Sequence, residues 1–184
     1  MTAIAIRPER NGDAPAIFAL TEAAFRDMPH ADGDEQQLVG QLRAEGDLAL
    51  SLVAEDATRI VGHAAFSPVT ISDGSKGWFG LGPVSVWPEL QRQGIGSALI
   101  KRGIADLRES GGRGIVLVGD PAYYARFGFE CDPALRYDGA EPRYFQRLVL
   151  GGDAPRGAVT FAPAFSAARS CLLYTSDAAD DSLR

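Results

Sequence analysis

One segment constrains the fold of this chain more than any other. The apolar run Trp78–Val86 is followed by apolar or glycine residues at positions 96, 99, 100, 103, 104 and 107. This spacing repeats every three or four residues, as one face of an amphipathic helix does. The unbroken apolar run Ile115–Val118 comes next and is typical of a strand covered on both faces. The segment therefore predicts a β-α-β unit with two parallel strands.

The rest of the chain also alternates strand and helix signals. The runs 50–54, 60–69 and 78–86 are separated by short turns, so we expect three antiparallel neighbours joined by hairpins. The predicted fold class is α/β, with helices and strands mixed: a central mixed, mostly antiparallel sheet, one β-α-β unit and flanking helices. The remaining predicted elements are strands at Ala3–Arg7, Phe145–Leu150 and Ala158–Phe161, a helix capped by Asn11 or Asp13, a helix at Glu35–Arg43 and a short helix stopped by Gly128.

Composition narrows the function classes. The chain has 184 residues, which suits one domain, here predicted over residues 1–165. A net charge of −6 without a basic run argues against a nucleic-acid partner or an anionic membrane surface. The sequence has no signal peptide and no apolar stretch of membrane-spanning length, so we expect a cytoplasmic protein. Cys131 and Cys171 have no metal-ligand spacing, and no metal is expected.

The stretch from Cys171 to Asp181, CLLYTSDAADD, resembles a translated sequencing adapter. The resemblance implies that the native gene was cut near Ser170 and that the residues after it are a cloning scar. Residues 166–184 are expected to form a disordered tail. The alternative is a natural acidic tail, which would also be disordered.

The start of the predicted helix has the features of a phosphate site. Gly94 and Gly96 allow close backbone approach, the first amides of a helix favour an anion, and Arg92 adds a positive charge. A P-loop would need a lysine directly before Ser97, and Gly96 stands at that position. A dinucleotide fold would need glycine or alanine where Leu99 stands. The alternative to a ligand site is a tight strand–helix turn with a solvated arginine.

Two separated motifs identify a family by resemblance. Gln91-Arg92-Gln93-Gly94-Ile95-Gly96 resembles the Gln/Arg-x-x-Gly-x-Gly/Ala signature of the GNAT acetyltransferases, and Tyr124–Phe129 resembles their Tyr-x-x-x-Gly-Phe element. The order of predicted elements is also similar over about residues 3–165, and the resemblance is to bacterial members. It implies a GNAT-like fold, an N-acetyltransferase and acetyl-CoA as cosubstrate.

The resemblance also implies roles for particular residues. Tyr124 would be catalytic, as the acid that protonates the departing CoA thiolate. Glycine and proline at Gly80, Gly82 and Pro83 fit a bulge that opens the sheet for the thioester. The CoA-binding residues implied by the motif are Val84, Ser85 and Val86 along the pantetheine arm, and Gln91, Arg92, Gln93, Gly94, Ile95, Gly96 and Ser97 around the pyrophosphate.

The general base is not evident from the sequence. The strand WFGLGPVSV has no acidic residue, whereas many GNAT members place a glutamate there. Water, a distant Asp or Glu, or an acceptor of low pKa would each serve. His63 fits a hydrogen-bonded strand histidine better than a base. Asp120 fits a helix cap better than a catalytic group, and the alternative for Tyr124 is packing beside Tyr123 and Phe127.

Two functions of different classes remain. The first is acetyl transfer from acetyl-CoA to a primary amine by direct attack in a ternary complex. The alternative is a non-catalytic acyl-CoA-binding or sensing module with the same fold. Small-molecule, peptide and protein amines all stay open as acceptors, and so does a homodimer. The polar residues Asp32, Asp34, Glu35 and Gln36 favour a cationic acceptor, although acids at a helix start also act as caps.

Overall fold

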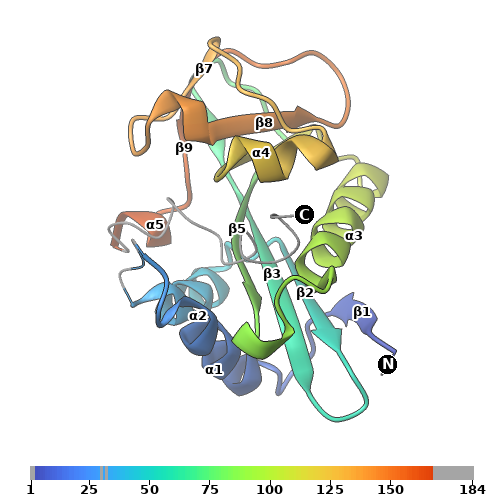
Figure 1. The fold of residues 1–184 in the computed structure, drawn as a ribbon. Helices are drawn as coiled ribbons and strands as arrows, with labels where there is room; N and C mark the ends of the chain where they lie inside the picture. Colours follow the sequence, from blue (N-terminus) through green and yellow to red (C-terminus); the bar gives the residue numbers. More distant parts are fainter. Residues whose placement is uncertain (1–2, 30, 32, 168–184) are drawn as a thin grey trace.

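A six-stranded sheet forms the centre of the structure, a computed structural model that describes residues 3–29, 31 and 33–167 (Figure 1). All neighbouring strands are antiparallel except β5 and β6, which are parallel. This arrangement confirms the predicted mixed, mostly antiparallel sheet. In spatial order the strands are β1 (Ala5–Pro8), β2 (Leu50–Glu55), β3 (Ile60–Pro68), β5 (Trp78–Val86), β6 (Gly114–Val118) and β8 (Phe145–Val149).

Helices cover both faces of this sheet. Helices α1 (Ala14–Phe25) and α2 (Glu35–Glu45) lie side by side on one face, and α3 (Ile95–Glu109) lies on the other (Figure 1). α3 approaches β3 closely at Gly103 of the helix and Phe66 of the strand. A Cβ added at Gly103 would lie 2.2 Å from the Phe66 ring. Only glycine at this position allows the helix to pack at this distance.

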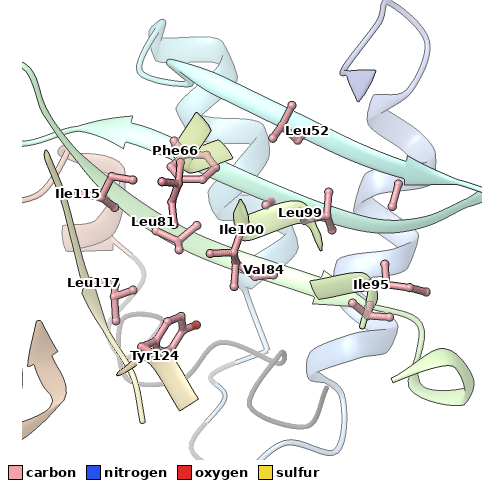
Figure 2. Close-up of a cluster of buried hydrophobic side chains, with 14 of the residues drawn as sticks. Leu52, Phe66, Leu81, Val84, Ile95, Leu99, Ile100, Ile115, Leu117 and Tyr124 are labelled. Carbon is pink, nitrogen blue, oxygen red and sulfur yellow. The ribbon is translucent and has the colours of Figure 1, made fainter. Parts of the chain in front are cut away.

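The predicted β-α-β unit is confirmed. β5 leads through α3 to β6, with Trp78 opposite Gly114 in the parallel pair. A buried cluster between α3 and the sheet contains Leu81, Leu99 and Ile115, and it extends to Tyr124 (Figure 2). This apolar layer fixes α3, and therefore the loop before it, against the central strands.

A second, smaller sheet was not predicted. It contains β4 (Thr70–Ile71), β9 (Gly157–Thr160) and β7 (Leu135–Arg136) in that order. β3 and β5 are antiparallel neighbours as predicted, but the connection between them holds β4 and is not a simple hairpin. β9 confirms the strand predicted at Ala158–Phe161, but β4 and β7 have two residues each and no measurable periodicity, so the sequence pattern did not reveal the sheet.

Several short helices connect the strands and the longer helices. α4 (Pro121–Tyr124) runs into η2 (Ala125–Phe127), which ends at Gly128 with a φ of 94°, as the glycine stop predicted. The other short helices are η1 (Pro88–Leu90), η3 (Pro142–Tyr144) and α5 (Ala164–Ala167). The adapter-like stretch from Cys171 lies outside the described residues. Among the helices that the structure describes, none has both the length and the apolar character to span a membrane.

Candidate active site

The central sheet opens between β5 and β6. Their parallel pairing runs only from Trp78–Gly114 to Gly80–Val116. The ladder between β3 and β5 shifts register where Ala64 and Phe66 oppose Val84 and Leu81, so β5 contains an extra residue there. The shift lies at Gly82-Pro83 and confirms the predicted bulge. It bends β5 at the point where its pairing with β6 ends.

The loop before α3 has an unusual backbone. Gly94 is the N-cap residue, with a φ of 84°, and Arg92 has a φ of 62°. Among the described residues Arg92 is the only non-glycine residue with a positive φ. This conformation costs an L-residue roughly 1–2 kcal/mol. Such local strain is concentrated at ligand sites, and turns of this kind form concavities of backbone amides that bind anions.

The side chains of the loop hold it to the end of β5. The Gln91 side-chain amide donates to the Val86 carbonyl at 3.1 Å, and the Gln93 amide donates to the Glu89 carbonyl at 3.4 Å. The first residues of α3, Ile95 and Gly96, are buried. The two glutamines therefore fix the loop against the end of β5 and the following turn.

A hydrogen bond joins this loop to the second motif. The Ser97 hydroxyl lies 3.1 Å from the Tyr123 hydroxyl, which connects the first turn of α3 to α4. The Arg126 guanidinium stacks over the Tyr123 ring, 4.5 Å from its centroid, and its Nε donates to the Tyr123 carbonyl. The sequence reasoning gave no role to Tyr123 or Arg126 in the site. Their signal was their position, since Arg126 lies inside the Tyr-x-x-x-Gly-Phe element and Tyr123 directly precedes it.

Tyr124 lies in the buried cluster that also contains Leu117 and Val84 (Figure 2). Its ring packs edge-on against Tyr123 at 4.9 Å and Phe129 at 5.8 Å. A Cβ at Gly119 would lie 2.4 Å from the ring, so the glycine after β6 makes room for it. The packing alternative describes the ring correctly, and a packed ring also holds its hydroxyl in a fixed position.

The face of the sheet below α1 has polar side chains next to β5. Ser85 is fully buried, and its hydroxyl donates to the Thr21 hydroxyl of α1 at 3.4 Å. On β3, His63 is also fully buried and lies directly opposite Ser85 in the strand register. The prediction of a satisfied histidine is right for Nε2, which lies 2.8 Å from the Ser51 hydroxyl. It is wrong for Nδ1, which has no hydrogen-bond partner among the described residues.

The other sequence candidates separate into caps and buried groups. Asp120 accepts a hydrogen bond from the Ala122 amide, as predicted for a cap. Asp34 begins α2 but makes no side-chain cap bond. Glu35 and Gln36 follow it and are both buried, at 1% and 5% exposure. Asp32 lies outside the described residues.

The chain matches a family model and several relatives. Residues 5–131 match the model described as "Acetyltransferase (GNAT) domain". The chain is 38% identical over 157 residues to the uncharacterized N-acetyltransferase YhbS of Escherichia coli K12, a match that covers 83% of this chain and 90% of YhbS. A crystal structure of a GNAT acetyltransferase from Brucella melitensis in complex with acetyl-CoA is 47% identical, with a TM-score of 0.80 and coverage of 90% and 99%.

The structure of Escherichia coli YhbS in complex with CoA is also similar. It has a TM-score of 0.80 and 34% identity, and the match covers 90% of this chain and 93% of that one. The range matched by the family model includes both motifs, at residues 91–96 and 124–129. This chain therefore belongs to the GNAT family of N-acetyltransferases.

Proposed function

We propose that the protein transfers the acetyl group of acetyl-CoA to a primary amine by direct attack in a ternary complex. The observation that carries the proposal is the position of the strained loop at Arg92. This loop connects the bulged strand β5 to α3, and β5 diverges from β6 beyond Gly80. The relatives solved with acetyl-CoA and with CoA support the same cosubstrate here.

Each part of the cosubstrate has a proposed partner. Backbone amides from Arg92 to Ser97 hold the pyrophosphate at the start of α3, where the helix dipole also favours negative charge. Backbone groups of Val84–Val86 pair with the pantetheine arm as another strand would. The thioester then lies in the opening between β5 and β6. A single domain over residues 1–165 contains all these parts.

The chemistry requires one bond to form and one to break. The amine nitrogen attacks the thioester carbonyl carbon, the C–S bond breaks, and the amine loses a proton. Tyr124 donates its phenolic proton to the thiolate and regains one from solvent. The buried ring of Tyr124, packed on Tyr123 and Phe129, holds that donor in place.

An amine screen tests the proposal. The protein is mixed with acetyl-CoA and a panel of polyamines, amino acids and short peptides, and free thiol is measured as CoA is released. We expect at least one amine to release thiol. We also expect Tyr124→Phe to lower kcat by at least about tenfold, because a positioned proton donor contributes about 10²–10⁴-fold.

The same screen separates the enzyme from a binding module. A module would bind acetyl-CoA, release no thiol with any amine, and lose nothing in Tyr124→Phe. Phe127→Leu is the matched control, because it removes a neighbouring ring without removing a hydroxyl. Equal losses of kcat in the two variants would mean that Tyr124 acts by packing and would contradict its acid role.

A further inference from the structure

A row of polar side chains crosses the sheet beneath α1, and it is half-buried at Ser51 and fully buried beyond it. Ser51 on β2, His63 on β3 and Ser85 on β5 lie on neighbouring strands, and Ser85 reaches Thr21 of α1. His63, Ser85 and Thr21 are each fully buried. Polar groups are seldom buried in this way without a use, because each must recover the hydrogen bonds that it loses to water.

The outer end of the row is anchored by an ion pair. The Glu9 carboxylate accepts from the Arg43 guanidinium at 2.7 Å and also accepts a short hydrogen bond from the Ser51 hydroxyl. Burial opposes ionisation of Glu9, but these hydrogen bonds and the charge of Arg43 hold its pKa below the ordinary value. Glu9 is therefore an anion at neutral pH, and it accepts the proton of the Ser51 hydroxyl.

This arrangement fixes the proton on His63. The Ser51 hydroxyl has one hydrogen, which points to Glu9, so its oxygen must accept from His63 Nε2. A neutral histidine with its proton on Nε2 has a lone pair on Nδ1. The lone pair is buried and has no partner among the described residues. His63 thus has a base nitrogen in the interior of the sheet.

The nearest polar neighbour on the central strand is Ser85. His63 and Ser85 are register partners on β3 and β5, and such directly opposed residues have Cβ atoms about 4.5–5.5 Å apart. Ser85 Oγ is not hydrogen-bonded to His63 Nδ1, and a change of the Ser85 side-chain rotamer, away from Thr21, would bring the hydroxyl toward that nitrogen. Ser85 also belongs to the segment proposed to follow the pantetheine arm.

We propose that His63 accepts the proton lost by the acceptor amine, through the Ser85 hydroxyl, and that Ser51 and Glu9 position and stabilise it. The inference rests on the proposed acetyl transfer and supplies the base that β5 lacks. Glu9, Ser51 and His63 do not touch the substrate, so they act as positioning and relay residues. Their arrangement resembles other carboxylate-supported histidine bases, with a serine hydroxyl between the two groups.

The protons balance in this scheme. As the N–C bond forms, the amine proton moves to Ser85 Oγ and the original Ser85 proton moves to His63 Nδ1. The resulting imidazolium donates through Nε2–H to Ser51, whose hydroxyl donates to the Glu9 anion. When the amide leaves, Nδ1 returns its proton to Ser85 Oγ, which releases one to the water that enters the emptied site, and His63 returns to its neutral form.

The charges around His63 agree with a neutral resting state. Burial lowers the pKa of His63 to about 4, while the Glu9 charge raises it and the Arg43 charge lowers it. From the other packed elements, β5 and α1 present the uncharged hydroxyls of Ser85 and Thr21. The Nδ1 lone pair is therefore available at neutral pH.

Kinetics of remote variants test the relay. With the best amine of the screen, we expect Ser51→Ala and Glu9→Gln each to lower kcat by at least about tenfold, with KM for acetyl-CoA unchanged. Ser51→Thr keeps the hydroxyl and should restore most of the rate. Ser67→Ala is the control, because Ser67 is a serine on β3 outside the relay and is more deeply buried than Ser51. Full kcat in folded Ser51→Ala and Glu9→Gln would overturn the proposal.

A second measurement needs no acceptor amine. Nitrogen-15 NMR of histidine-labelled protein reports which ring nitrogen carries the proton, and His30→Gln assigns the signals because the chain has 2 histidines. We expect His63 to be neutral and protonated on Nε2. Protonation on Nδ1 would overturn the relay even if amines are acetylated. A wild-type protein that acetylates no amine would instead overturn the proposed function itself.

Discussion

His63 shows how one residue can combine a cost in stability with a chemical use. Its ring is fully buried, and burial lowers its pKa from 6.5 to about 4. Between these two values the unfolded chain binds a proton that the folded chain does not. The free energy of unfolding therefore falls as pH drops below about 6.5 and is insensitive to His63 above it.

We predict a measurable consequence for unfolding. Between about pH 7 and about pH 5, His63 should lower the free energy of unfolding by about 2 kcal/mol. Urea denaturation at both pH values should show this loss in the wild type, whereas His63→Gln should show less pH dependence. Glu9 does not obscure the result, because its pKa lies below 4.5 and its contribution is lost only at lower pH. Equal pH dependence in both proteins would contradict burial of a neutral His63.

Some site residues could be predicted from the sequence and others could not. The glycine pair at residues 94 and 96 and Tyr124 were found because they lie in short contiguous motifs. The left-handed conformation of Arg92 has no sequence signal, because arginine rarely adopts it. The hydrogen bonds of Ser51 to Glu9 and to His63 could not be predicted either, because they join three segments that are distant in the sequence and meet only through the strand register.

At the scale of elements, the packing of α3 on β3 positions the proposed phosphate site. The helix lies against Phe66 at Gly103, and its first turn reaches Tyr123 through Ser97. The stripe of apolar residues predicted this helix and the face that it buries. The stripe did not explain why a glycine stands at position 103, since that follows from the Phe66 ring across the interface.

We predict that Gly103→Ala destabilises the protein, although alanine favours helices. The added Cβ would lie 2.2 Å from the Phe66 ring, and overpacking typically costs about 1–3 kcal/mol. Gly40→Ala is the matched control, because a Cβ added at Gly40 in α2 would have no neighbour within 4 Å. This substitution should be neutral or stabilising. Chemical denaturation of the two variants measures the difference. The double variant Gly103→Ala with Phe66→Leu should recover part of the loss, and no recovery would contradict the assigned contact.

At the scale of the whole molecule, the sheet separates two functions. The proposed phosphate loop belongs to α3 on one face, and the His63 row lies beneath α1 on the other face. The opening between β5 and β6, the proposed position of the thioester, lies between the two faces. The sequence was sufficient to predict the main sheet, the three long helices and the β-α-β unit, because long periodic segments determine them. It predicted β9 as a strand but not its pairing with β4 and β7, which are too short to show a period.

The proposed acetyl transfer requires acetyl-CoA to bind at the loop before α3. The melting temperature of the full chain measures this binding. At a hundredfold excess over the dissociation constant, we predict stabilisation of about 2.7 kcal/mol by acetyl-CoA and by CoA. Gly94→Ala should abolish the shift, whereas Gly74→Ala should retain it, because Gly74 has a similar φ of 85° in a turn outside the site. No shift in folded wild-type protein, or an equal shift in folded Gly94→Ala, would contradict binding at this loop.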